Sequence, residues 1–269
     1  MTRQAVYKRL ARARHRQQEL EPVVERVKEI RRPLRRLGTR KLYYLIKPEL
    51  ESRGIKLGRD GLFTLLRERQ LLIKPKKSYT KTTHSKHWLR KYPNLLAGRQ
   101  ITEPEQAFVS DITYVESREG VHYLSLVTDA GSRKIMGHAL SRDMKTVHMV
   151  KAVKQAARAR STKKPLIHHS DRGLQYCSKE YQMALEKHDI EPSMTEEYDC
   201  YQNALAERIN GILKQEFLLD RCNTFEELEK VINQSIDLYN DMRPHLSLGM
   251  KTPNQVHKES RLPTATGFV

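Results

Sequence analysis

Apolar residues between Glu19 and Gln70 recur at intervals of three and four, the period of an amphipathic helix. They form three groups that predict three short helices: Val23, Val27 and Ile30; Leu42, Leu45, Ile46 and Leu50; and Leu62, Leu65 and Leu66. Gly38 separates the first two groups, and the Gly-containing segment 53–58 separates the last two. The last two helices predict a helix-turn-helix, with Arg59 to Arg69 entering the major groove. A small helical bundle with an incidentally basic surface is the alternative.

The pattern changes near residue 100, where stretches rich in Val, Ile, Tyr and Thr begin. Three of them, separated by Gly-containing turns, predict an antiparallel meander over residues 107–117, 121–130 and 133–141. The following patterns predict a helix from Thr146, a strand at 165–171, a helix from Lys179 to His188, a strand at 189–195, a helix containing Glu207, and a helix from Phe225 to Tyr239. The order βββαβαβα is typical of an α/β domain.

Residues 74–100 show neither period and combine Lys, Thr and His with Pro and Gly, which predicts an extended basic linker. His84 and His87 have no Cys partners in this part of the chain, so we interpret them as solvated or DNA-facing rather than as zinc ligands. Trp88 is the only tryptophan, and we expect it to pack onto the domain that follows.

Basic charge is concentrated at the front of the chain. Residues 1–100 hold 28 Lys and Arg against 8 Asp and Glu, whereas residues 101–269 hold 22 against 24. A polyanion attracts such a segment and releases counterions on binding, so nucleic acid is the expected partner. A basic face kept for solubility is the alternative. An anionic membrane surface fits less well, because no basic helix carries an aromatic insertion face.

Length and composition predict a globular, cytoplasmic protein. The 269 residues are 38% hydrophobic, which is enough for a core. No run of about 18 apolar residues occurs, and the N-terminus lacks the apolar segment of a secretory signal. Cys177, Cys200 and Cys222 have no CxxC spacing, so we expect reduced thiols rather than disulfides or a zinc knuckle.

Three acidic residues have contexts that suit metal-binding carboxylates. Asp111 lies inside a strand that otherwise looks buried, where an unpaired charge costs several kcal/mol unless a cation compensates it. Asp171 ends the strand at 165–171, where its side chain can emerge at the carboxyl edge of the sheet. Glu207 lies on an amphipathic helix, with 35 residues between it and Asp171. Taken singly, each of the three could instead have a structural role, as a turn residue, a helix cap or a solvated surface group.

Glu207 shares its helix face with other polar residues. Asn203, Glu207, Asn210 and Lys214 recur at intervals of four, three and four, which places them on one polar stripe, while Leu205, Ile209, Ile212 and Leu213 face the core. The stripe is expected to face a site. Asp129 and Asp143 flank another strand and are the runner-up acids, without comparable motif context.

Three motifs carry a resemblance to a known family. They are Val-Ser-Asp-Ile-Thr-Tyr-Val at 109–115, His-Ser-Asp-Arg-Gly at 169–173, and Asn-Ala-Leu-Ala-Glu-Arg at 203–208 followed by Lys214; Tyr239-Asn240, Arg243-Pro244-His245 and Thr252-Pro253 add to them. The chain resembles an acidic-triad (DDE) transposase of bacterial insertion sequences, specifically the OrfB product of the insertion sequence 3 family. The similarity covers nearly the whole chain.

The resemblance implies a ribonuclease-H-like, retroviral-integrase-type catalytic core at 101–220. It would be preceded by a basic arm at 1–18, an all-α helix-turn-helix region at 19–73 and the linker at 74–100, and followed by a helical C-terminal segment at 221–269.

The implied activity is metal-dependent cleavage of a DNA 3′-end and its strand transfer, through a branched and then a circular intermediate. Asp111 and Asp171 would share two Mg²⁺ ions, which Mn²⁺ could replace, and Glu207 would complete one shell. Double-stranded DNA, as element ends and as target, is the implied substrate, bound by a dimer or higher oligomer on paired ends. A product of an upstream reading frame is a possible fused or associated partner.

DNA contacts are expected from three places. On and beside the Glu207 helix and the Asp171 turn they are Lys214, Asn210 and Arg172; on the helix-turn-helix, Arg59, Arg67 and Arg69; in the linker, Lys74, Lys76 and Lys77. His168, His169 and Asn203 are weaker site candidates. Two other functions stay open: a helix-turn-helix regulator without catalysis, and a nuclease of the same fold that cuts without joining.

Overall fold

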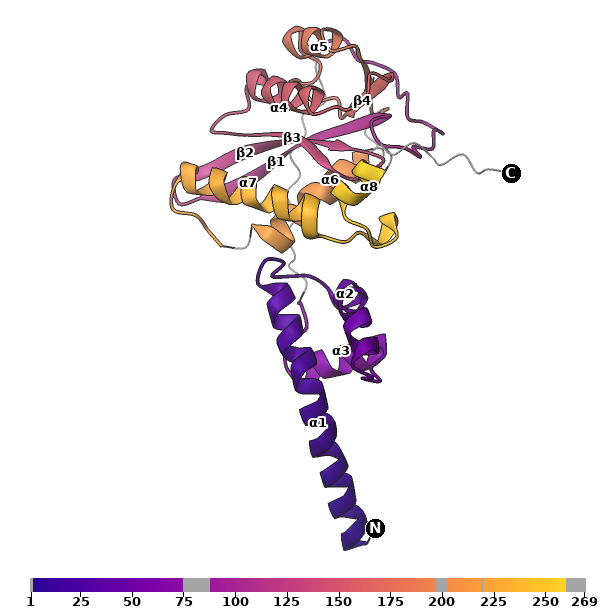
Figure 1. Cartoon of the computed structure of the whole chain (residues 1–269). Helices are drawn as coiled ribbons and strands as arrows, with labels where there is room; N and C mark the ends of the chain where they lie inside the picture. Colours follow the sequence, from indigo (N-terminus) through magenta and orange to yellow (C-terminus); the bar gives the residue numbers. More distant parts are fainter. Residues whose placement is uncertain (1, 75–87, 197–202, 219, 260–269) are drawn as a thin grey trace, which may run out of the picture. The chain divides into compact units, whose positions relative to one another are not determined.

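The computed structural model describes residues 2–74, 88–196, 203–218 and 220–259, so Lys76, Lys77, His84, His87 and Cys200 lie outside the described residues. The chain divides into two compact units, residues 1–76 and 77–269, which are treated separately (Figure 1).

The first unit consists of three helices, α1 (Arg3–Arg31), α2 (Thr39–Ser52) and α3 (Arg59–Glu68). Its core is formed by apolar residues at the predicted helical spacing: Leu20, Val23, Val24, Val27, Leu42, Ile46, Leu50, Leu62, Leu65 and Leu66. Gly38 is the N-cap of α2, and the segment between α2 and α3 coincides with the predicted turn at 53–58. Three helices and their turns are therefore confirmed.

The first helix is much longer than expected. It has 29 residues and begins at Arg3, where the hydroxyl of Thr2 accepts a hydrogen bond from the backbone N–H of Ala5. The predicted arm at 1–18 is thus the first half of α1, which extends past α2 and α3 (Figure 1). Apolar spacing did not predict this half, because its stability comes from strong helix formers such as Ala, Arg, Gln and Leu rather than from a buried face.

The second unit is built on a five-stranded mixed sheet in the order β3-β2-β1-β4-β5. Its strands are β1 (Ala107–Ser117), β2 (Gly120–Asp129), β3 (Ile135–Ser141), β4 (Leu166–Ser170) and β5 (Ile190–Met194). The first three form the predicted antiparallel meander, whereas β4 and β5 run parallel to β1. The helices between them, α4 (Thr146–Arg158) and α5 (Lys179–Glu186), complete the predicted βββαβαβα order with α6 (Ala204–Ile212).

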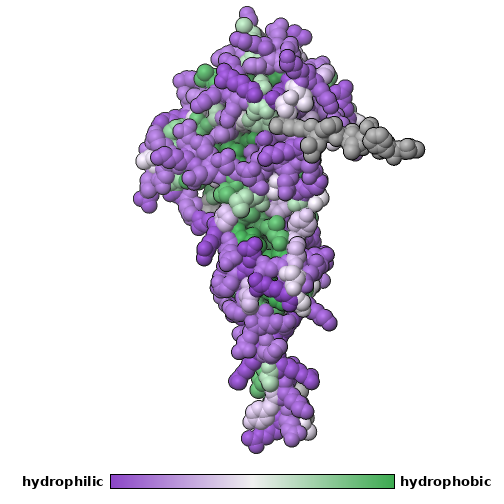
Figure 2. Space-filling model, in the orientation of Figure 1, coloured by the Kyte–Doolittle hydropathy of each residue, from purple (hydrophilic) through white to green (hydrophobic). Residues whose placement is uncertain are grey.

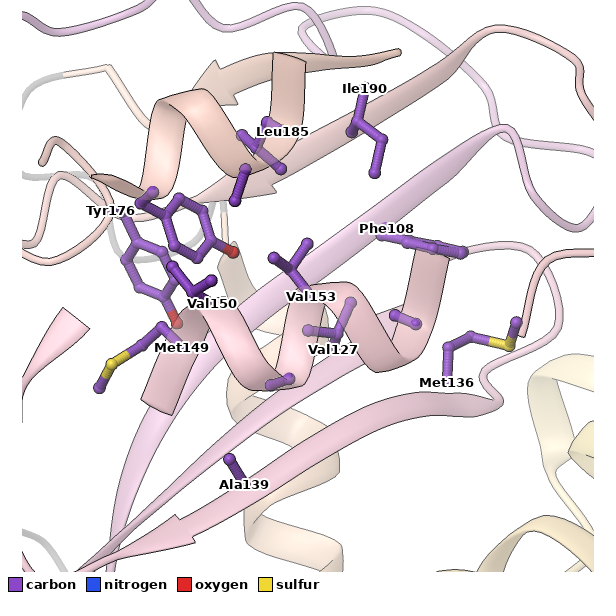
Figure 3. Close-up of a cluster of buried hydrophobic side chains, with 14 of the residues drawn as sticks. Phe108, Val127, Met136, Ala139, Met149, Val150, Val153, Tyr176, Leu185 and Ile190 are labelled. Atoms are coloured by element: carbon purple, nitrogen blue, oxygen red, sulfur yellow. The ribbon is translucent and has the colours of Figure 1, made fainter. Parts of the chain in front are cut away.

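Helices cover both faces of the sheet (Figure 1). One face packs against α4 and α5, and its core contains Phe108, Val127, Met149, Val153 and Leu185 (Figure 3). At Gly137 on β3 an added Cβ would lie 2.1 Å from the backbone oxygen of Ala152, so the strand approaches α4 as closely as only glycine allows.

The opposite face of the sheet packs against α6, against the π-helical turn η2 (Leu213–Phe217) and against α7 (Phe225–Met242). This core joins Val115, Leu124 and Leu126 of the sheet to Ile209 and Ile212 of α6 and to Leu228, Ile232 and Ile236 of α7. The predicted boundary at residue 220 is therefore not a break in packing, because α7 completes the same core as α6. A short 3₁₀ turn, η3 (Leu246–Leu248), and α8 (Pro253–Glu259) follow.

Trp88 does not pack as expected, since 92% of its surface is exposed. Leu89 and Tyr92 contact the α4–α5 core instead.

The segment 88–100 contains neither helix nor strand, as the linker interpretation predicts for this part. The face in Figure 2 is predominantly hydrophilic, with small apolar areas. Of the helices that the structure describes, none has both the length and the apolar character needed to span a membrane.

Candidate active site

Asp111 lies in the middle of β1, opposite Leu126 of β2, and is partly buried. Because side chains alternate along a strand, it shares the α6 side of the sheet with Val109, Thr113 and Val115. Its Oδ2 accepts a hydrogen bond of 2.7 Å from Nδ2 of Asn210 on α6. Burial, followed by the negative charge of Asp171, raises the pKa of Asp111 to about 7.

Asp171 follows β4 directly and lies level with Asp111. The parallel register pairs Ala107 with Ile167 and Val109 with His169, and the same offset carries Asp111 to Asp171. The backbone N–H of Gly173 donates a 3.0 Å hydrogen bond to Oδ1 of Asp171. A Cβ at Gly173 would lie 2.9 Å from that oxygen, so the Asp-Arg-Gly turn needs glycine to hold the carboxylate in this position.

Glu207 lies in the first turn of α6, and its side chain is exposed. Partial desolvation and then the charge of Asp171 raise its pKa. Glu207 also contributes to the raised pKa of Asp111. The three predicted carboxylates are therefore close enough to repel one another, although they come from β1, from the end of β4 and from α6.

The predicted polar stripe does face this site, because α6 and η2 run along β1. Nδ2 of Asn203 donates to the backbone oxygen of Ser110 at 3.1 Å, Nδ2 of Asn210 donates to Asp111, and Nζ of Lys214 donates to Oγ1 of Thr113 at 3.1 Å. Oδ1 of Asn210 is buried and has no hydrogen-bond partner among the described residues. The stripe thus fixes the strand that carries Asp111.

The carboxylates are near one another but not gathered as a ligand set. Within the described ranges, no three His, Cys, Asp or Glu side chains lie close enough together to hold a metal ion.

The weaker candidates have structural partners. His168 is buried and hydrogen-bonds to Ser110 at 2.7 Å and to Tyr181 at 2.9 Å, and burial lowers its pKa to about 3. Nδ1 of His169 is 2.9 Å from the hydroxyl of Ser193.

The two runner-up acids also serve the fold. Asp129 is buried and accepts hydrogen bonds from the backbone of Glu105 and Ser132. Asp143 accepts a hydrogen bond from the backbone N–H of Lys145, the residue before α4, and it also contacts His148 within α4.

The expected DNA contacts fall into different environments. Arg67 and Lys74 are exposed, Arg172 is partly buried, and Arg59 contacts Asp60. Arg69 forms an ion pair of 2.6 Å with Glu21 of α1, a contact that the sequence did not predict. Asn210 is buried and directed at Asp111, so its contact is with the carboxylate.

Two features of the site were missed from the sequence. Thr113 lies two residues after Asp111, so strand periodicity could have shown that both face α6. The ion pair between Glu216 and Arg243 joins η2 to the end of α7, and only the Arg-Pro-His motif pointed toward it.

Comparison with known proteins identifies the class. Two models described as integrase core domain match residues 101–200 and 188–253. Among solved structures, a chain of the simian T-cell lymphotropic virus intasome in complex with PP2A regulatory subunit B56 gamma matches with a TM-score of 0.54 and 16% identity, over 86% of this chain and 78% of that chain. The second unit is therefore a ribonuclease-H-like core of the integrase type.

Similar curated proteins identify the family within this class of integrase-type proteins. A 31 kDa protein of insertion element IS600 from Shigella sonnei is 38% identical over 219 residues, which are 80% of this chain and 79% of that protein. Transposase InsF for insertion sequence IS3A of Escherichia coli K12 is 30% identical over 215 residues, 79% of this chain and 75% of the relative. The chain belongs to the insertion sequence 3 family of transposases.

Proposed function

We propose that Asp111, Asp171 and Glu207 are the metal-binding triad with which this transposase cuts the 3′-end of its element and joins it to DNA. The observation that carries the proposal is electrostatic. Burial and then the charge of Asp171 raise the pKa of Asp111, and desolvation and the same charge raise the pKa of Glu207, although the three carboxylates come from separate elements. Such an arrangement stabilises no fold by itself and is typical of a functional site.

The donor set suits hard divalent cations. Carboxylate oxygens are the ligands that Mg²⁺ prefers, and the unpartnered Oδ1 of Asn210 adds an uncharged oxygen beside Asp111. Two Mg²⁺ ions, or Mn²⁺ in their place, would be held by Asp111 and Asp171 with Glu207 completing one shell. They would supply an activated water or 3′-hydroxyl and stabilise the leaving 3′-oxygen.

The remaining residues orient the triad and the DNA. Asn210 directs Asp111 through its 2.7 Å hydrogen bond, and the N–H of Gly173 directs Asp171. Nζ of Lys214 donates to Oγ1 of Thr113, which lies two residues beyond Asp111 on β1. From this position Lys214 contacts terminal phosphate or bases. Arg172 follows Asp171 directly and is a further candidate for phosphate contact.

Binding to DNA resides mainly in residues 1–100, where the positive charge is concentrated. The helix-turn-helix formed by α2 and α3, and the basic residues that follow it, bind the ends of the element. Two ends are handled together by a dimer or a higher oligomer, and a product of an upstream reading frame is fused to this chain or associated with it. The joined product is first branched and then circular.

The test incubates labelled duplexes that carry the element ends with the protein and Mg²⁺, and compares wild type with Asp111→Asn, Asp171→Asn and Glu207→Gln. Each substitution is expected to lower cleavage and joining by at least about 10³-fold, since it removes a charged ligand. DNA binding is expected to persist. The runner-up variant Asp143→Asn is the matched control and is expected to retain activity.

The same assay decides between the alternatives. A chelator such as EDTA is expected to abolish both steps, and added Mg²⁺ or Mn²⁺ to restore them. Cleaved ends without joined product would favour the nuclease, and binding without any cleavage would favour the regulator. Full activity in any of the three triad variants would contradict the site assignment.

A further inference from the structure

Two short motifs near the end of the chain, Tyr239-Asn240 and Arg243-Pro244-His245, lie away from the acidic triad in sequence and have no role in the chemistry above. The structure gives the first pair an anchoring contact. Oη of Tyr239 donates to the backbone oxygen of Arg133 at 2.9 Å. Asn240 exchanges two hydrogen bonds with the backbone of Ile135, at 3.0 and 3.1 Å, as a neighbouring strand would. The end of α7 is thereby fixed to the start of β3.

Arg243 follows α7 directly and carries one of the few buried charges of the unit. Its Nε and Nη2 donate to Oε2 and Oε1 of Glu216 at 2.8 and 2.6 Å, so the ion pair is bidentate. Only 3% of the Arg243 side chain and 22% of the Glu216 side chain are exposed. Nη1 lies 3.2 Å from Nε2 of His245, whose ring packs edge-on against Tyr239. The guanidinium is thus held on all sides.

Glu216 belongs to η2, the π-helical turn that continues α6. The turn closes with a hydrogen bond from the N–H of Leu218 to the oxygen of Leu213, five residues earlier. Turns of this kind are rare, occur mostly as single turns within helices, and are frequent at functional sites. Because a π turn advances less per residue than an α turn, it changes the direction in which the side chains of residues 213–217 leave the helix.

Lys214 lies in the same turn, two residues before Glu216. Its Nζ reaches Oγ1 of Thr113, on the strand that carries Asp111. The direction of Lys214 therefore depends on the wide turn. Leu213 fixes the start of this turn in the core, and the ion pair with Arg243 ties Glu216, near its end, to the residue that follows α7.

We propose that Arg243 is a positioning residue of the transposase: its bidentate ion pair with Glu216 holds the π turn in the form that directs Lys214 along β1 toward Asp111. The inference rests on the proposed role of Lys214 as a DNA contact. It explains why an arginine with a planar fork lies there, since a lysine has the charge but makes no two parallel hydrogen bonds to one carboxylate.

The experiment is a double-mutant cycle in the full-length protein, with wild type, Arg243→Lys, Lys214→Ala and the double variant. Strand transfer is measured at saturating element ends, and thermal unfolding is followed for each variant. Arg243→Lys is expected to lower the transfer rate by ~10 to 100-fold, because misplacing a positioning group by about 1 Å has effects of this size. In the Lys214→Ala background the same change is expected to have an effect of less than ~2-fold.

Arg221→Lys is the matched control, because Arg221 also lies beyond η2 but donates to the backbone of Ser117 at the far end of β1. It is expected to keep the wild-type rate. Independent, multiplying effects of Arg243→Lys and Lys214→Ala would overturn the inference, as would an unchanged rate in Arg243→Lys. Full activity in Lys214→Ala would instead remove the proposed role of Lys214 and the inference with it, while leaving the triad untouched.

Discussion

Burial and neighbouring charge strongly disfavour the ionised form of Asp111. It is partly buried on β1, and burial and then the charge of Asp171 raise its pKa to about 7, although hydrogen bonds from the backbone of Ile112 and from the amide of Asn210 stabilise its charged form. Burial and the neighbouring negative charge thus oppose ionisation of this carboxyl group, and a bound cation would favour it. A divalent ion competes directly with that proton, so metal binding and ionisation of the site are coupled.

Gly173 provides a test of how closely Asp171 must be held. Gly173→Ala is expected to lower strand transfer by about 100-fold, because the new Cβ would lie 2.9 Å from Oδ1 of Asp171 and displace the carboxylate. Gly211→Ala on α6 is the control, since nothing lies within 4 Å of its added Cβ. That variant is expected to keep its activity and to gain roughly 0.5–1 kcal/mol in unfolding free energy. Equal activities of the two variants would contradict this role of Gly173.

His168 predicts a pH dependence of stability. Burial, followed by the charge of His169, lowers its pKa in the folded protein to about 3. The unfolded chain takes up this proton near pH 6.5, so the contribution of His168 is fully present above that pH and is lost as the pH falls toward about 3. The slope reaches at most about 1.4 kcal/mol per pH unit.

Urea unfolding of wild type and His168→Gln between pH 4 and 7 measures this contribution. The unfolding free energy of the variant is expected to fall less steeply with decreasing pH, whatever its absolute stability. Parallel slopes for the two proteins would show that His168 takes up its proton at the same pH in the folded and unfolded states, and would contradict a lowered pKa.

At the scale of elements, α6 and η2 are what connect the triad to the rest of the unit. Polar side chains of α6, of its N-cap and of η2 contact β1 at Ser110, Asp111 and Thr113, while the apolar side chains of α6 and η2 pack with α7. Because α6 and η2 contact β1 on one side and α7 on the other, they hold Glu207 and Lys214 at fixed positions along β1, which is distant in sequence.

Much of the arrangement of helices and strands around the site could be predicted from the sequence. Strand alternation located β1, and helical spacing placed Asn203, Asn210 and Lys214 on one stripe, because both periods are local properties of the backbone. The π turn and the pair between Glu216 and Arg243 were not predicted, since they depend on tertiary contact between α7 and η2. The early start of α1 was missed for the opposite reason, because that half of the helix buries no apolar face.

The helix α3 offers a comparison between two arginines two residues apart. Arg67 is exposed, whereas Arg69 pairs with Glu21 of α1 at 2.6 Å. Arg67→Ala is expected to weaken DNA binding and to lower the slope of log affinity against log salt by about one. Arg69→Ala is expected to act mainly on the thermal stability of the first unit. Titrations at several salt concentrations measure both, and an unchanged salt slope for Arg67→Ala would contradict its contact with phosphate.

At the scale of the whole molecule, the basic charge and the acidic site lie in different parts of the chain. The positive charge belongs to residues 1–100, and the acidic site and the integrase-type fold belong to the second unit. The second unit also extends beyond the predicted core, because α7 completes the hydrophobic core that holds α6. The sequence predicted a separate segment at 221–269, because an apolar pattern locates the buried face of a helix but does not identify the elements against which that face packs.

One acidic triad, Asp111, Asp171 and Glu207, is proposed to perform both cutting and joining. The most direct measurement uses duplexes whose element ends already carry a free 3′-hydroxyl, so that only the joining step is followed, in Mg²⁺, for wild type, Asp111→Asn, Asp171→Asn and Glu207→Gln. Wild type is expected to join these ends, and each variant is expected to bind them and fail to join them. Joining of precleaved ends at the wild-type rate by any of the three variants would contradict the account.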